Sequence, residues 1–142
     1  MAITKEQWEK IETVLSGHFA SAVFTYKGFE LTVAREPISE SQTALIVYID
    51  GQYAMAWGYS NLKHEVSAPD IVSEVWRART KSLYSAKRVK ELEKGLGKRA
   101  CNKMGIYDKI HFHVPDFSKA SVLVRQYKKL DGIELLEPEV LL

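Results

Sequence analysis

The sequence contains a single cysteine, Cys101, so no disulfide can form within the chain of 142 residues. A lone cysteine is typical of a protein that folds in a reducing compartment. No apolar run approaches the roughly 20 residues that a membrane-spanning helix requires. The N-terminal residues also lack the apolar segment of a signal peptide. We therefore expect a cytoplasmic protein that does not enter a membrane.

Residues with catalytic or metal-binding chemistry are sparse. His111 and His113 alternate along a predicted strand and would project from the same side of it, as two metal ligands can. A zinc site needs three or four ligands. The other candidates, His18, His64 and Cys101, follow no spacing that would complete such a site. We expect no cofactor and no bound metal, and an enzyme with a metal site at His111 and His113 is kept as an alternative.

The charge is distributed unevenly along the chain. The net charge is only +2, but the segment from Arg77 to Lys109 holds 11 Lys or Arg against 3 Asp or Glu, a local charge of +8. The other residues therefore sum to −6. A positive segment of this size exceeds what solubility requires and indicates a polyanionic or acidic partner.

The N-terminal segment predicts a helix. Thr4 and Gln7 have the spacing of a capping box, in which each side chain satisfies a backbone N–H of the first turn. Apolar residues recur at helical spacing from Trp8 to Leu15, and Gly17 is expected to end the helix as a left-handed cap.

Two β-hairpins are predicted next. In the first, residues 22–26 and 29–33 flank a two-residue loop, which pairs apolar positions throughout. In the second, residues 44–49 and 52–57 flank Asp50-Gly51, a dipeptide that tolerates the positive φ angles of a tight hairpin turn. Both faces of the second hairpin are apolar, which predicts a central position in a sheet.

Further helices are expected in the second half of the chain. One begins between Ser67 and Asp70 and breaks near residues 82–84. Ser85 caps another, which has a bend or a short break at the glycines of residues 95–97 and ends at Gly105.

The last elements predicted are a strand over residues 110–114, a helix capped by Ser118 and a short strand over residues 133–136. Together these elements predict an α+β fold: a mainly antiparallel sheet of four to six strands, with helices packed on at least one face. We expect one domain spanning residues 1–142.

The helix that Ser85 caps carries a stripe of lysines. On a helical wheel its apolar residues gather on one side and Lys87, Lys90, Lys94 and Lys98 on the other. If the bend at the glycines is small, such a stripe could follow a phosphate backbone. A solvated helix face and a contact with an acidic protein fit the same pattern. The candidate binding residues are Arg77, Arg79, Lys81, Lys87, Arg88, Lys90, Lys94, Lys98, Arg99 and Lys103.

Aromatic residues form a second candidate surface. Tyr48, Tyr53 and Trp57 share one face of the second predicted hairpin, together with Met55. Such a face could stack nucleic-acid bases, or a helix could cover it.

Four short segments carry a resemblance. Residues 75–85 and 96–100, with Thr4-Lys5-Glu6-Gln7 and Val47-Tyr48-Ile49-Asp50-Gly51, resemble a group of small proteins encoded by bacteriophages and prophages. The resemblance implies an accessory role in the cytoplasm of a bacterial host and favours a binding protein over an enzyme. It implies no site residues.

The leading hypothesis is a non-catalytic binding module that uses residues 77–103 to bind a polyanion, and in particular nucleic acid. The alternatives are a protein-interaction module or inhibitor that acts on an acidic host protein, and the enzyme with a metal site. The sequence leaves the oligomeric state open, a homodimer included.

Overall fold

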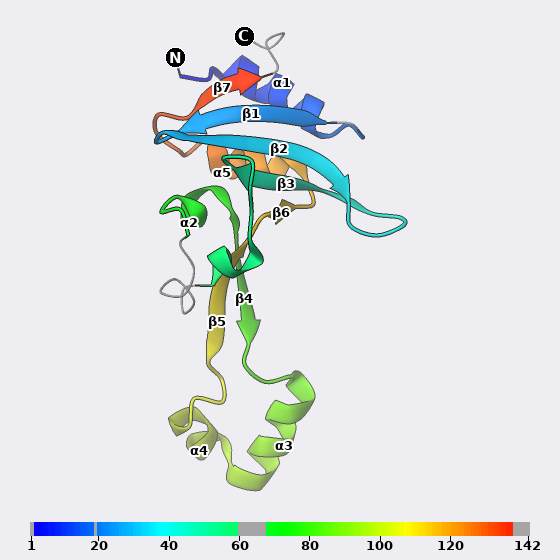
Figure 1. The fold of residues 1–142 in the computed structure, drawn as a ribbon. Coiled ribbons are helices and arrows are strands. Elements are labelled where there is room, and N and C mark those ends of the chain that lie inside the picture. Colours follow the sequence, from blue (N-terminus) through cyan, green and yellow to red (C-terminus); the bar gives the residue numbers. More distant parts are fainter. Residues whose placement is uncertain (1, 19, 60–67, 138–142) are drawn as a thin grey trace. The chain divides into compact units, whose positions relative to one another are not determined.

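The computed structural model describes residues 2–18, 20–59 and 68–137, and their fold is α+β, as predicted (Figure 1). The chain forms two compact units: unit 1, residues 1–77 and 113–142, and unit 2, residues 78–112. A single domain over residues 1–142 stays a prediction. Among the described residues, no helix is long and apolar enough to span a membrane.

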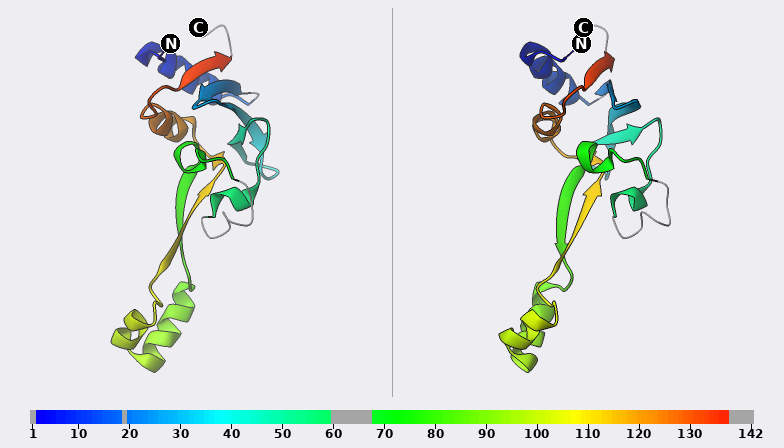
Figure 2. Two further views of the ribbon diagram at one scale, coloured as in Figure 1. Left: turned by 60° about the vertical axis from the view of Figure 1, so that its left-hand side comes forward. Right: turned by 90° about the vertical axis from the view of Figure 1, so that its left-hand side faces the viewer.

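Unit 1 is built on a five-stranded antiparallel sheet with the strand order β6-β3-β2-β1-β7. Helices α1 and α5 lie on the same face of this sheet (Figure 2). The elements of unit 1 are α1 (Lys5–Leu15), β1 (Ser21–Tyr26), β2 (Phe29–Pro37), β3 (Thr43–Ile49), the 3₁₀ helix η1 (Met55–Gly58), α2 (Val72–Val75), β6 (Asp116–Phe117), α5 (Ala120–Tyr127) and β7 (Glu134–Glu137).

Helix α1 begins as predicted but ends differently. The Thr4 hydroxyl accepts a hydrogen bond from the Gln7 backbone N–H at 3.1 Å, and the Thr4 N–H donates to the Gln7 side chain at 2.9 Å, which completes the capping box. The prediction that Gly17 caps the C-terminus is wrong. Ser16 is the C-cap in the right-handed region, and its hydroxyl donates to the Glu12 carbonyl at 2.8 Å. That bond satisfies one of the last carbonyls without a left-handed residue.

The first hairpin is confirmed in its register. Tyr26 pairs with Phe29, and Ala22 pairs with Val33. The second turn is also confirmed, since Asp50 and Gly51 both have positive φ, at 52° and 79°.

The strand predicted over residues 52–57 is wrong. The edge of β3 that it would occupy is taken, because β6 pairs there and the Val47 N–H donates to the Pro115 carbonyl at 2.9 Å. The chain therefore leaves the sheet after a single bridge between Ile49 and Gln52 and forms η1.

The helix predicted to run toward residues 82–84 is a single turn, α2. The chain becomes extended at Trp76, which is fully buried, and continues as a strand from Arg77. The Arg77 guanidinium donates to the Asp116 carbonyl at 2.8 Å and contacts its carboxylate at 3.1 Å. Burial of Trp76 and this ion pair favour an extended chain where helix propensity alone would continue the helix.

The last helix starts one residue later than a Ser118 cap would allow. Lys119 is the N-cap of α5, with no side-chain hydrogen bond. Ala120 and Leu123, on the inner face of α5, are buried at 4% and 0% exposure, so packing sets the helix register. The short strand predicted over residues 133–136 is confirmed as β7.

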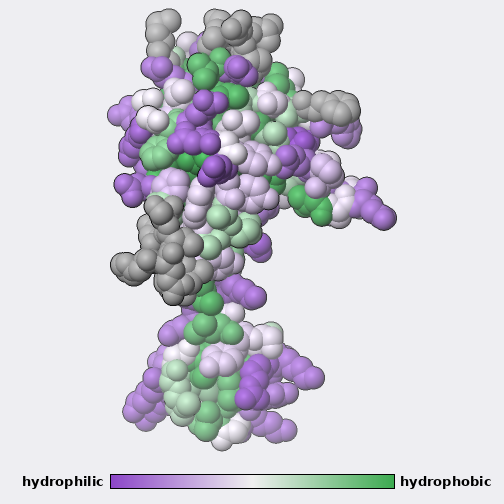
Figure 3. Space-filling model, in the orientation of Figure 1, coloured by the Kyte–Doolittle hydropathy of each residue, from purple (hydrophilic) through white to green (hydrophobic). Residues whose placement is uncertain are grey.

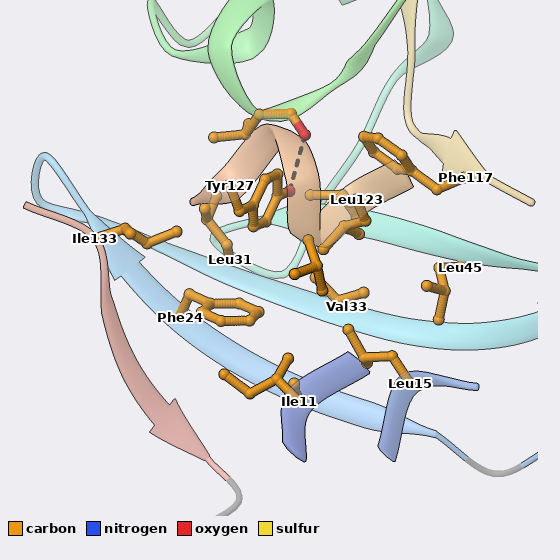
Figure 4. Close-up of a cluster of buried hydrophobic side chains, with 14 of the residues drawn as sticks. Ile11, Leu15, Phe24, Leu31, Val33, Leu45, Phe117, Leu123, Tyr127 and Ile133 are labelled. Atoms are coloured by element: carbon orange, nitrogen blue, oxygen red, sulfur yellow. Dashed lines mark hydrogen bonds between the residues drawn. The ribbon is translucent and has the colours of Figure 1, made fainter. Parts of the chain in front are cut away.

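The core of unit 1 lies between the sheet and its two helices (Figure 4). Tyr127 of α5 is at its centre, fully buried, and its ring packs edge-on against Phe24 and Phe117 with centroid distances of 5.7 and 6.3 Å. Its hydroxyl donates to the Val75 carbonyl at 2.8 Å. Gln126 donates to the carbonyls on either side of Val75, at 2.8 and 2.9 Å. Helix α5 thus satisfies three consecutive carbonyls at the end of α2.

Replacement of Tyr127 by Phe should destabilise unit 1 by about 1–3 kcal/mol, because the buried Val75 carbonyl loses its donor. Urea denaturation measures the difference. The matched control is Tyr53→Phe, a change at a tyrosine that is 45% exposed, which should stay within about 0.5 kcal/mol of the wild type. Equal stability of Y127F and the wild type would contradict the role given to this hydrogen bond.

Candidate nucleic-acid interface

Unit 2 contains two helices, α3 (Ala86–Leu96) and α4 (Lys98–Lys103), and most of a two-stranded sheet formed by β4 (Arg77–Ser82) and β5 (Lys109–Val114). The Leu83 N–H donates to the Asp108 carbonyl at 3.2 Å, which joins the chain just after β4 to the residue before β5. The predicted strand over residues 110–114 is confirmed.

The helix that Ser85 caps is divided at the predicted glycines. Ser85 accepts a hydrogen bond from the Arg88 N–H at 3.2 Å and starts α3. Gly97, with φ 82° and ψ 157°, separates α3 from α4. These angles are accessible almost only to glycine. Lys98 therefore belongs to α4, and the single stripe of four lysines, which required a small bend, does not form on one helix.

All the cations of unit 2 face solvent. Between residues 78 and 112 there are ten Lys or Arg and three Asp or Glu, a charge of +7. Among the described residues, Arg88 is the one cation of this unit that forms an ion pair, with Glu91 at 3.4 Å, and both side chains are more than half exposed. The exposed cations are Arg79, Lys81, Lys87, Arg88, Lys90, Lys94, Lys98, Arg99, Lys103 and Lys109.

Two of the predicted arginines have other contacts. Arg77 belongs to unit 1 and is held by Asp116, as described above. The Arg79 guanidinium lies 5.9 Å from the centre of the Phe112 ring, in the range of a cation–π contact. Arg77 is therefore not part of the exposed cationic surface.

Unit 2 also exposes apolar side chains. Helix α3 has no buried residue, although one side of it is apolar. Six of the eleven exposed large hydrophobic side chains in the described part of the chain belong to this unit. In Figure 3, apolar surface (green) over α3 and α4 lies between hydrophilic areas (purple). The six are Leu83, Tyr84, Leu96, Met104, Tyr107 and Ile110.

A groove of about 860 Å³ runs along α3, and we call it the unit 2 groove. Its apolar lining comes from Leu83 and Tyr84 before α3, Val89 on α3, and Ile106 and Tyr107 after α4. The two tyrosines are 38% and 40% exposed. The segments on either side of the helices thus contribute one aromatic ring each.

Lysines and one carboxylate complete the unit 2 groove. Lys81, Lys90 and Lys109 line it from β4, α3 and β5. Glu93 lines it as well and is half-buried. Partial burial raises the pKa of Tyr107, and the negative charge of the nearby Glu93 raises it further. The groove therefore combines one carboxylate and two aromatic rings with three cations.

Sequence reasoning missed Tyr84, Tyr107 and Lys109 as site residues. A local signal was present, since Tyr84 precedes the helix cap Ser85 and Tyr107 follows the terminating Gly105. Aromatic residues at both ends of a lysine-rich helical segment indicate rings beside cations.

The aromatic residues that the sequence did single out lie in unit 1. Tyr48 packs edge-on against Tyr53 with a centroid distance of 5.2 Å, and Trp57 stacks on Trp76 at 6.1 Å. Because Trp57 lies in η1 rather than in a strand, the three residues do not form the continuous stripe that was expected. Of the three, Tyr53 is the exposed one.

The histidines and the cysteine form no metal cluster within the described ranges 2–18, 20–59 and 68–137, where no group of three His, Cys, Asp or Glu could hold an ion. His64 lies outside these ranges. His111 is exposed and His113 half-buried on β5, and Cys101 is fully buried in α4.

No family model matches the chain, and neither a curated protein nor a solved structure matches it. The function therefore has to be inferred from the chemistry of the molecule itself.

The Tyr48 hydroxyl should make the protein sensitive to alkaline pH. It donates to both oxygens of the Glu36 carboxylate at 2.7 Å, and this hydrogen bond, with partial burial, raises the pKa of Tyr48 to about 12. In the unfolded chain tyrosine titrates near its ordinary pKa of about 10. The stabilisation from Tyr48 is therefore complete below about pH 10 and is lost as the pH rises toward 12.

Denaturation of the wild type and of Tyr48→Phe between about pH 9 and 12 tests this expectation. The stability advantage of the wild type over Y48F should shrink across that interval. An advantage that stays constant with pH would contradict the coupling of Tyr48 to Glu36.

Proposed function

We propose that the protein is a small, non-catalytic accessory protein of phage type that acts in the bacterial cytoplasm and binds nucleic acid through unit 2. The observation that carries the proposal is the exposed charge of +7 in unit 2, where ten cations face three acids. Within the described part of the chain, most of these cations have no carboxylate partner to displace before they meet a phosphate. Contacts of this kind supply affinity for a phosphate backbone without reading its sequence.

The arrangement on α3 supports the proposal. Lys87, Lys90 and Lys94 are spaced by three and four residues, so their side chains leave the helix on the same side, about 5.4 Å apart per turn. Lys98, Arg99 and Lys103 add a second exposed group on α4. Two short helices thus offer phosphate contacts on separate axes.

Binding of a labelled oligonucleotide should depend strongly on salt. Contact with about four phosphates gives a slope of roughly −3 to −4 in a plot of log affinity against log salt concentration. Joint replacement of Lys87, Lys94 and Lys98 by Gln should reduce the steepness of that slope by about 2 and weaken binding at 50 mM salt by about tenfold or more. Fluorescence anisotropy across a salt series measures both quantities.

The matched control replaces three exposed lysines of unit 1, Lys5, Lys10 and Lys129, by Gln. It removes the same charge from the chain and should leave the slope and the affinity close to those of the wild type. Equal losses in the two triple variants would mean that net charge, and not unit 2, governs binding. A flat salt response of the wild type would contradict the proposal.

An acidic host protein is the second candidate partner. It is favoured by Leu96 and Met104, which are 48% and 64% exposed and lie outside the lining of the unit 2 groove. Large apolar residues in contact with a partner protein often dominate affinity, whereas cations at the rim of an interface contribute less.

For such a partner, Leu96→Gln with Met104→Gln should abolish capture from nuclease-treated bacterial lysate, while Lys87→Gln with Lys94→Gln should weaken it only slightly. Quantitative pull-down with the two double variants makes the comparison. The reverse order of effects would exclude binding through apolar anchors.

A further inference from the structure

The unit 2 groove has a chemistry that phosphate binding alone does not require. Cations on an exposed helix are sufficient for contact with a backbone. This groove adds two partly exposed aromatic rings, Tyr84 and Tyr107, with Leu83 and Ile106 beside them. A ring exposed next to lysines can stack on a nucleic-acid base, because every base has a π-face.

Glu93 constrains how a nucleic acid could enter. This residue lines the groove and lies close to Tyr107, so a phosphate placed there would meet a like charge. Lys81, Lys90 and Lys109 supply the attractive charge from three different elements around the same groove. The favourable arrangement puts phosphates at the lysines and uncharged bases against the tyrosines.

Only unpaired bases can lie against the tyrosines while the phosphates of the same strand contact the lysines. In a duplex the bases are paired and stacked inside the helix, and the surface offers phosphates and groove edges. A volume of about 860 Å³ is within the range of about 300–1,000 Å³ that is usual for pockets that hold small organic groups.

We propose that unit 2 binds single-stranded nucleic acid in preference to duplex, with unpaired bases stacked on Tyr84 and Tyr107 in the unit 2 groove. This inference rests on the proposed function and adds the form of nucleic acid and the residues that select it. The lysines supply affinity for any nucleic acid, and the tyrosines supply the preference for unpaired bases.

The test measures anisotropy of a labelled oligothymidine of about 12 nucleotides and of a duplex of the same length, at about 50 mM salt. The wild type should bind the single strand about tenfold or more tighter than the duplex. Tyr84→Ala should weaken single-strand binding by about five- to a hundredfold, as loss of one stacking ring does, and change duplex binding little.

Two further variants separate stacking from other causes. Tyr84→Phe keeps the ring and should bind the single strand like the wild type. Tyr53→Ala removes a ring of comparable exposure, 45% against 38% for Tyr84, from unit 1 and should change neither affinity. Circular dichroism of Y84A, whose side chain is on the surface, verifies that the fold is retained.

Each contrary result has a distinct meaning. Equal affinity for single strand and duplex, or no loss in Y84A, would overturn base stacking and leave nucleic-acid binding by unit 2 intact. If polyglutamate competes as effectively as unlabelled oligothymidine, the result would overturn base stacking in favour of an acidic polypeptide partner. Failure of both nucleic acids to bind would overturn this inference and the proposed function together.

Discussion

Unit 2 is too small to enclose a core, and its surface follows from that constraint. Segments below about 40 residues rarely bury enough apolar area to be stable without another support. Among residues 78–112 only Cys101, Ile106 and Phe112 are buried hydrophobic residues. The apolar side of α3 consequently stays open, because no further layer exists within the unit to cover it. The same shortage of interior keeps Tyr84 and Tyr107 accessible beside lysines.

Unit 1, in contrast, is large enough to enclose a core. Its sheet and two helices bury large side chains completely, and Tyr127 and Gln126 satisfy the carbonyls at the end of α2. The chain leaves this framework at Arg77 and re-enters it at His113, and the ion pair of Arg77 with Asp116 holds the exit point. The core residues of unit 1 lie outside residues 78–112, so the packing of its interior does not involve side chains of unit 2.

The parts of the fold that could be predicted from sequence are those that neighbouring residues determine. The Thr4–Gln7 capping box, the Asp50-Gly51 turn and the Ser85 cap each depend on side chains within four positions. The predictions for residues 52–57 and 77–82 were wrong because contacts with residues far away in the sequence determine the local structure there. At residues 52–57, the edge of β3 is already occupied by Pro115 and β6. At residues 77–82, the strand forms by pairing with β5. Neither pairing is visible in the neighbouring sequence.

The candidate site divides in the same way. Its charge could be predicted because lysines and arginines are counted directly. The groove was not predicted, since Tyr84 and Tyr107 are far apart in sequence. The turn near Gly105 and the Leu83–Asp108 hydrogen bond place them at the same groove.

Gly97 has a mechanical consequence for the proposed nucleic-acid ligand. A continuous helix would align its ammonium groups along one straight line, which matches the contour of a stiff rod such as duplex DNA, with a persistence length of about 150 base pairs. The interruption at Gly97 distributes the cations over two helices, α3 and α4. A polymer that contacts both must follow a change of direction within a few nucleotides, and a flexible chain does so at far lower elastic cost than a rod.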